Sequence, residues 1–224
     1  MGNRKVKFVE GEYYHIYNRG VESRIVFNEK GDLDRFVESI KEFNSLESYG
    51  GIYRSLFDKY KNRKTGKKLV SIVCYAFNPN HYHFLMTPLV DKGIENFMQK
   101  LGTGYTMYFN KKYKRKGVLF QGVFKSAHVD SNEYLLHLSA YINLNDKVHQ
   151  LRGETSQLVK NSWDSYAGNN MAKTRDSLLG DTSIITEQFK NAKEYREFAE
   201  DILPSIIERK KSLKELEQMM IDED

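Results

Sequence analysis

The chain has 224 residues, of which 40% are hydrophobic and 29% charged, and it contains 3 prolines, a composition typical of one folded domain with at most an appended segment. A multidomain machine and a disordered chain are therefore excluded. No stretch approaches the roughly 20 apolar residues that a membrane helix needs, and the N-terminus lacks the apolar run of a secretory signal, so we expect a cytoplasmic protein with no membrane span.

The charge is unevenly distributed along the chain. Residues 187–224 contain 7 basic and 11 acidic residues, and the rest of the chain carries a net charge of +9. Two basic runs that include tyrosine, Lys59–Lys68 and Lys111–Lys116, have the composition of sites that bind a phosphate backbone and stack on unpaired bases. Charge on solvated loops would explain each run equally well.

A strand and a helix are the first predicted elements. Residues 12–19 alternate and are rich in aromatic residues, which predicts a strand that ends at Gly20. Apolar residues then recur with helical spacing from Asp32, which is available as the helix cap, and Gly50-Gly51 can end this helix. Residues 52–67 form a basic insertion that we expect to be a loop or flap.

A β-hairpin follows. The apolar, β-branched run of residues 68–77 predicts a strand buried on both faces, in which Cys74, the single cysteine, is a buried thiol. Asn78-Pro79-Asn80 predicts a turn, and residues 81–88 alternate as the second strand does in a hairpin.

The second half of the chain is mainly helical. A helical pattern runs from Asp91 to Phe109, a loop and strand occupy residues 118–129, and Ser131 or Asn132 can cap a helix over residues 133–145. After a polar segment, residues 183–224 are again helical.

The resulting order, β-α-β-β-α-β-α, predicts an α+β protein. It matches a ferredoxin-like split βαββαβ unit, an antiparallel sheet with helices on one face, followed by a further helix. We expect this domain to cover residues 1–150 and a loop and helical extension to cover residues 151–224, with Trp163 packing the extension against the core.

Two histidines have spacing that suits a metal. His81 and His83 lie two residues apart on a predicted strand, so both imidazoles point to the same face and could share one divalent ion. Histidines that are buried for structural reasons give the same pattern.

The helix over residues 133–145 offers a nucleophile and a third ligand. Tyr141 and Asn145 are four residues apart and share a helix face, which His137 extends. If this face lies on the sheet beside the histidines, the amide can complete a metal shell with the phenol next to it. A tyrosine packed in a helix seam is the competing interpretation.

Five blocks of the chain resemble a known family in the same order. They are YYHIYNRG (13–20), FNPNHYHFLMTP (77–88), YTMYFNKKYKRKGVLFQGVFKS (105–126), YINLN (141–145) and SWDSYAG (162–168). The chain resembles the single-tyrosine HUH transposases, especially the branch of REP-associated tyrosine transposases. The resemblance implies that His81 and His83 are the HUH histidines, Tyr141 is the nucleophile and Asn145 is the third metal ligand.

The implied activity is metal-dependent cleavage and rejoining of single-stranded DNA, in particular of hairpin-forming repeats, through a covalent 5′-phosphotyrosine. Mg²⁺ or Mn²⁺ would act on the scissile phosphate. The protein would act as a monomer or a homodimer, with the tyrosine helix serving its own chain or a partner's. The residues expected to contact DNA are Lys111, Lys112, Lys114, Arg115, Lys116, Gln121, Lys125, Tyr105, Tyr108, Tyr113, His15 and Arg19.

Two positions depart from the family pattern. Asp146 stands where the family has proline, which would put an extra carboxylate near the metal, and Val123 stands where arginine is common. His128 and His149 fall outside the motif, and we expect both at the surface. His15 is expected to have a structural or DNA-contacting role rather than a ligand role.

Three other functions use the same residues. A hairpin-binding module without cleavage activity needs the basic and aromatic surface but not Tyr141. A metal hydrolase would turn over without a protein–DNA ester. A replication initiator or relaxase would share the tyrosine chemistry.

Overall fold

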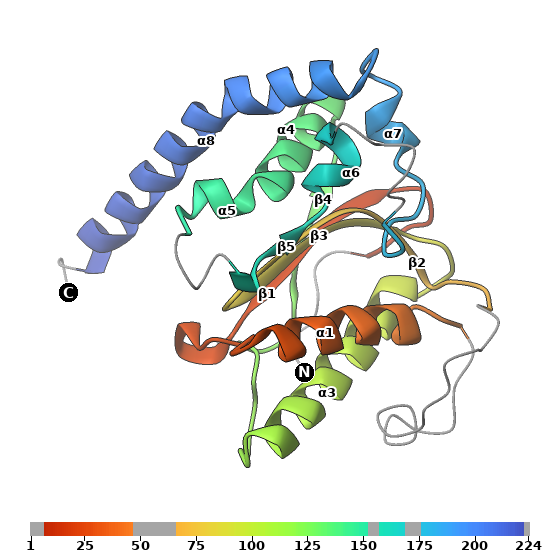
Figure 1. Ribbon diagram of the computed structural model, residues 1–224, viewed down its shortest axis with the longest axis vertical. Helices are drawn as coiled ribbons and strands as arrows, with labels where there is room; N and C mark the ends of the chain where they lie inside the picture. The colour runs from red at the N-terminus through yellow and green to blue at the C-terminus, as the bar shows by residue number, and fades with distance from the viewer. Residues whose placement is uncertain (1–6, 47–65, 152–156, 169–175, 222–224) are drawn as a thin grey trace.

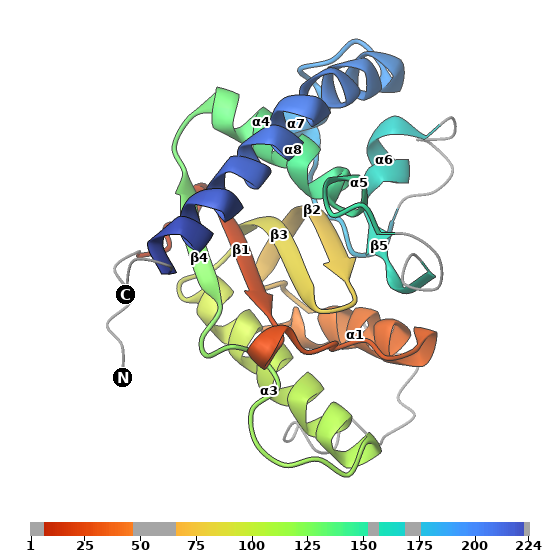
Figure 2. The ribbon, with the colours of Figure 1, turned by 90° about the vertical axis from the view of Figure 1, so that its left-hand side faces the viewer.

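A five-stranded antiparallel sheet forms the centre of the protein. The computed structural model describes residues 7–46, 66–151, 157–168 and 176–221. The strands lie in the order β4-β1-β3-β2-β5, side by side in Figure 2. Their bounds are Tyr13–Arg19 (β1), Val70–Asn78 (β2), His81–Pro88 (β3), Lys125–Val129 (β4) and Lys160–Asn161 (β5). The predicted α+β fold is confirmed, including the hairpin of β2 and β3.

Helices cover both faces of this sheet (Figure 1). On one face lie α1 (Lys30–Phe43) and α3 (Gly93–Lys112), which are the two helices of the split βαββαβ unit. The opposite face carries α4 (Asn132–Asn143), α5 (Asn145–Val148), α6 (Trp163–Ala167), α7 (Ser183–Thr186) and α8 (Ala192–Ile221). A short 3-10 helix, η1 (Val21–Ser23), follows β1.

Strand alternation separates two apolar clusters. Ile16 and Phe84 face α1 and α3 in the larger cluster, whereas Leu85 and Val73 face α4 and α8 in the other. Every residue of β2 is buried, as expected for a central strand covered on both faces, and Cys74 is among them.

The start of α1 differs from the prediction. Glu29, not Asp32, is the N-cap residue, and Asp32 lies at the third helical position, where it completes a capping box. The helix ends at Phe43 with Asn44 as its C-cap. Gly50-Gly51 and nearly all of the predicted loop or flap lie outside the described residues, together with most of the basic run Lys59–Lys68.

The predicted helix over residues 133–145 is two helices. Ser131 caps α4 by accepting a hydrogen bond from the Tyr134 amide, as predicted, but α4 ends at Asn143. Asn145 begins α5 after a break at Leu144. Tyr141 and Asn145 are therefore on consecutive helices rather than on one helix face.

The C-terminal extension packs on the outer edge and face of the sheet. β5 pairs with β2, and the Gly180 amide donates to the Ile72 carbonyl at 2.8 Å. The Tyr166 hydroxyl donates to the Val73 carbonyl at 2.7 Å. Trp163 lies with its ring centroid 6.3 Å from that of Tyr195 in α8, which agrees with its predicted packing role. The domain boundary at residue 150 stays a prediction.

None of the helices in the described parts of the chain is both long and apolar enough to cross a bilayer.

Candidate active site

His81 and His83 lie on the face of β3 that α4 covers. Their ring centroids are 5.2 Å apart and the ring planes are nearly perpendicular. His83 is buried and His81 is half-buried. The alternation of β3 therefore brings the two imidazoles together, as the spacing predicts.

His15 holds the ring of His83. It lies on the neighbouring strand β1, is 9% exposed, and its Nε2 is 2.9 Å from Nδ1 of His83. One of these nitrogens donates to the other, so Nδ1 of His83 is engaged and Nε2 is the nitrogen available to a ligand. His15 is too deeply buried for the predicted DNA contact, and its position agrees with a structural role.

Tyr141 approaches the same histidines from α4. Its ring is 5.4 Å from that of His83 and 6.3 Å from that of His15, edge-on in both cases. Burial raises the pKa of the phenol, and a hydrogen bond with Asn145 acts in the opposite direction. The phenol is therefore protonated at neutral pH and needs help to become a nucleophile.

Asn145 reaches His81 from the start of α5. Its Oδ1 is 3.3 Å from Nε2 of His81. Nδ1 of His81 donates to Oδ1 of Asn80 at 2.6 Å, so Nε2 carries a lone pair. Two lone-pair atoms thus converge on one place, which is the arrangement of two ligands of one cation.

Asn78 also contacts the two atoms that converge here, Nε2 of His81 and Oδ1 of Asn145. It is fully buried at the end of β2, directly opposite His81 in the hairpin. Its Nδ2 donates to Nε2 of His81 at 2.9 Å and to Oδ1 of Asn145. Sequence analysis assigned Asn78 only to the turn.

His149 is also part of the site, although we expected it at the surface. Its ring centroid is 4.5 Å from that of His81, and its Nε2 is buried with no hydrogen-bond partner among the described residues. Its position one turn after Asn145, on a helix that already carries a site residue, is the signal that could have found it. His128, in contrast, is exposed as predicted and lies 2.8 Å from Glu12.

Burial keeps the imidazoles neutral. It lowers the pKa of His15 to about 4 and that of His149 to about 3. The pKa of His81 is lowered to about 4, first by burial and then by the charges of Lys210 and Arg19, whereas a hydrogen bond that the protonated ring donates to Asn145 acts in the opposite direction. Burial also holds the pKa of His83 well below 6.5. Neutral imidazoles are the form that binds metal.

The donor set fits a divalent cation only if amide oxygens take part. Among the described residues, no cluster of three or more His, Cys, Asp or Glu side chains could hold a metal. Asp146 accepts a hydrogen bond at Oδ1 from Asn161 at 3.2 Å, and its expected effect on the metal stays a prediction. His81, His83 and Asn145 offer two imidazole nitrogens and one amide oxygen, a set that divalent metals accept.

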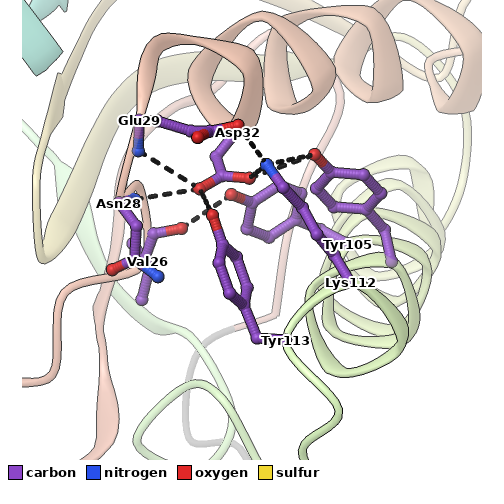
Figure 3. A network of polar contacts seen from close by, with 8 residues as sticks. Val26, Asn28, Glu29, Asp32, Tyr105, Lys112 and Tyr113 are labelled. Atoms are coloured by element: carbon purple, nitrogen blue, oxygen red, sulfur yellow. Dashed lines mark hydrogen bonds and ion pairs between the residues drawn. The ribbon is translucent and has the colours of Figure 1, made fainter.

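Several residues expected to contact DNA make contacts within the protein (Figure 3). Tyr105 is fully buried in the core, where its hydroxyl donates to the Val26 carbonyl at 2.6 Å, so it cannot stack on a base. Tyr108 and Tyr113 donate their hydroxyls to Asp32 at 3.0 and 2.7 Å. Lys112 pairs with Asp32 and Glu29.

Arg115 likewise makes contacts within the protein: it donates to Oδ1 of Asn110 in α3 at 2.7 Å and to the Val118 carbonyl at 3.3 Å. The remaining predicted contacts are exposed and stay predictions: Lys111, Lys114, Lys116, Gln121, Lys125 and Arg19. Arg19 donates to Gln121, which joins the end of β1 to the loop before β4. Val123 in this loop is 73% exposed.

Lys210 of α8 is a further cation beside the site. Its Nζ donates to the Val148 carbonyl at 3.3 Å, next to His149. Its charge lowers the pKa of His81, His83 and His149, in each case after burial. Sequence analysis did not single out the basic run 209–211, because the extension that contains it has a net negative charge.

Comparison with known proteins gives the family. Residues 9–145, more than half of the chain, match the family described as "Transposase IS200 like". The chain belongs to the IS200-like transposase family. Its site residues His15, His81, His83, Tyr141 and Asn145 all fall within the matched segment. No curated protein matches this transposase.

Two solved structures are similar to this IS200-like transposase. A REP-associated tyrosine transposase bound to a REP hairpin is 13% identical, over 81% of this chain and 93% of its own, with a TM-score of 0.52. This likeness supports the fold. A bacterial tRNA(His) guanylyltransferase-like protein in complex with ATP is 9% identical, over 75% of this chain and 71% of its own. Its TM-score of 0.33 is too low to indicate a shared fold.

Proposed function

We propose that this transposase cleaves and rejoins single-stranded DNA at hairpin-forming repeats, with Tyr141 as the nucleophile. The observation that carries the proposal is the position of the Tyr141 ring, 5.4 Å from His83 on the face where His81 and Asn145 converge. Tyr141 also packs against the apolar cluster between the sheet, α4 and α8, and its edge-on contact with His83 distinguishes it from a tyrosine buried only in a helix seam.

The chemistry needs no external energy. The Tyr141 oxygen forms a bond to phosphorus and the bond from phosphorus to the 3′ oxygen breaks, which leaves a 5′-phosphotyrosine and a free 3′-OH. The phenol loses a proton and the departing oxygen gains one. A 3′-OH then reverses the step to join the strands.

His81, His83 and Asn145 would hold the divalent cation, Mg²⁺ or Mn²⁺, which supplies positive charge next to the scissile phosphate. His15 fixes the ring of His83 through the 2.9 Å contact, and Asn80 fixes that of His81. Lys210 and Arg19 add positive charge at the same place, and the exposed lysines before β4 would hold the DNA backbone.

The geometry supports a site formed by one chain. The ring of Tyr141 is 5.4 Å from that of His83 of the same chain, which favours an enzyme that acts in cis without the helix of a second subunit. A monomer is the assembly that this arrangement favours.

The test is a covalent adduct. Wild type and Tyr141→Phe are incubated with labelled hairpin DNA and Mg²⁺ or Mn²⁺, and protein-linked DNA is measured on a denaturing gel. Tyr134→Phe, on the same helix, is the matched control. We expect a metal-dependent adduct with wild type and Tyr134→Phe and none with Tyr141→Phe.

Two other results would contradict the proposal. Tight hairpin binding with no adduct in either metal would identify a binding module without cleavage activity. Cleavage that persists in Tyr141→Phe without a protein-linked product would identify a metal hydrolase.

A further inference from the structure

Asn78 carries one of two buried polar atoms of the site that lack a hydrogen-bond partner among the described residues, the other being Nε2 of His149. The Asn78 side chain is 0% exposed, yet its Oδ1 has no hydrogen-bond partner among the described residues. A buried carbonyl oxygen without a partner destabilises the folded state. Such a group at the centre of a polar cluster indicates a function beyond packing.

The amide nitrogen of Asn78 lies beside two of the expected metal ligands. Nδ2 donates at once to Nε2 of His81 and to Oδ1 of Asn145. Both atoms are acceptors, because Nδ1 of His81 already donates to Asn80. An N–H₂ group that bridges two metal-ligand atoms does for them what a positive ion does.

The distances suit an octahedral ion. Ligands at about 2.1 Å from Mg²⁺ or Mn²⁺ place neighbouring ligand atoms about 3 Å apart. Nε2 of His81 and Oδ1 of Asn145 are 3.3 Å apart, and the terminal atom of Asn78 is 2.9 Å from Nε2. Two of the three spacings among these atoms are therefore close to that of neighbouring ligands in an octahedral shell, and Asn78 lies closer still to Asn145.

We infer that Asn78 is a fourth ligand of the metal site, which it joins by turning its amide so that Oδ1 faces the cation. The inference rests on the proposed function, which requires a divalent cation at this site. Turning the amide exchanges the positions of Oδ1 and Nδ2, so the atom that points away from His81 and Asn145 lacks a partner among the described residues in either orientation. The cation replaces the two hydrogen bonds that Nδ2 made.

This shell consists of neutral groups, namely two imidazoles and two amides. Metal affinity in proteins rises with the number of charged ligands. A carboxylate at residue 78 should therefore bind the cation more tightly, and an apolar side chain of similar size should bind it more weakly.

The test measures Mn²⁺ binding by the loss of the free-ion electron paramagnetic resonance signal, without DNA. The proteins are wild type, Asn78→Asp, Asn78→Leu and the control Asn143→Asp. Asn143 is equally buried, but its Nδ2 donates to Tyr195 at 2.8 Å, away from the histidines. We expect a dissociation constant about tenfold lower for Asn78→Asp, several-fold higher for Asn78→Leu, and unchanged for Asn143→Asp.

Wild-type affinity in Asn78→Leu would overturn the inference, since the residue would then only fill space. Thermal unfolding with and without Mn²⁺ checks that each variant folds, and Asn78→Leu keeps the test decisive if Asn78→Asp does not fold without metal. If neither wild type nor Asn78→Asp binds Mn²⁺, the inference is wrong whether or not an adduct forms. If the Asn78 variants respond as expected but no adduct forms, the metal site stands and strand cleavage is wrong.

Discussion

Lys112 Nζ lies 2.5 Å from Asp32 Oδ1, so the last turn of α3 supplies the cation for a carboxylate buried in the first turn of α1. The same carboxylate accepts hydrogen bonds from two tyrosine hydroxyls of α3 and its loop and from the Asn28 and Glu29 amides. Asp32 therefore fastens the two helices of one face of the sheet (Figure 3).

Lys112→Met should destabilise the fold. It leaves a buried carboxylate without its cation, and breaking a buried pair in this way costs roughly 3–5 kcal/mol. Because hydrogen bonds to Asp32 remain, we expect a decrease of about 2 kcal/mol in the free energy of unfolding, measured with urea. The exposed Lys116→Met is the control, and an equal decrease in both variants would argue against a specific role for the pair.

The contribution of Asp32 should disappear in acid. Burial would raise the pKa of this carboxyl, but hydrogen bonds from Lys112, Tyr113 and Tyr108 and the charge of Lys112 outweigh it and hold the pKa below the ordinary 3.8. A carboxyl with a lowered pKa in the folded state stabilises fully above its unfolded pKa and loses this effect as the pH falls through the folded pKa.

The stability difference between wild type and Asp32→Asn should accordingly be constant from about pH 7 to 5 and shrink below about pH 4. Urea unfolding at a series of pH values measures it. A difference that persists unchanged at the lowest pH at which both proteins fold would show that the charge of Asp32 contributes nothing.

Within the region 105–116, substitutions of exposed lysines should weaken DNA binding, whereas substitution of the buried Tyr105 should not. Replacing Lys111, Lys114 and Lys116 with Gln should lower the slope of log affinity against log salt by about 0.7–0.9 for each DNA phosphate that the protein no longer neutralises. Tyr105→Phe should leave the affinity unchanged but cost about 1 kcal/mol in stability, since the Val26 carbonyl loses its partner. Weaker hairpin binding by a folded Tyr105→Phe variant would contradict this assignment.

Lys210→Gln should slow adduct formation and lower the salt slope by about 0.7–0.9, because it removes one cation beside the histidines. Lys193→Gln removes a charge from the same helix at an exposed pair with Glu197 and serves as the control. If Lys210 only ties α8 to α5, the melting temperature will fall while the salt slope stays at the wild-type value.

His15→Phe should weaken metal binding by about 10–100-fold, the effect typical of removing the partner of a metal-binding histidine. The ring volume is kept, but phenylalanine cannot form the 2.9 Å hydrogen bond that orients His83. Mn²⁺ titration gives the readout, and His128→Phe is the matched control at the surface. Equal affinities would show that His83 needs no such support.

Local pattern predicted most of the fold. The alternation of residues 81–88 placed His81 and His83 on one face, and the apolar run before the turn gave the buried strand β2. The spacing of Tyr105 and Phe109 along the apolar face of α3 already indicates that both are buried. The prediction that Tyr105 stacks on DNA is wrong because it did not take this spacing into account.

The site was only partly predictable because its members come from segments that are distant in sequence. Asn78 looks like a turn residue until its pairing with His81 places it beneath Asn145. His149 looks exposed until the break at Leu144 turns α5 toward His81. These contacts depend on how the second layer of helices packs, which local sequence does not encode.

The pairing of β5 with β2 has a consequence for how the chain can be divided. β2 is buried along its whole length and mostly apolar, and residues beyond 150 pair with its outer edge at Ile72, Tyr75 and Phe77. A fragment that stops at residue 150 would present this edge unpaired, and an open apolar edge strand recruits strands from other molecules. The extension thus protects the transposase from aggregation, and an active truncated form would need a substitute for β5.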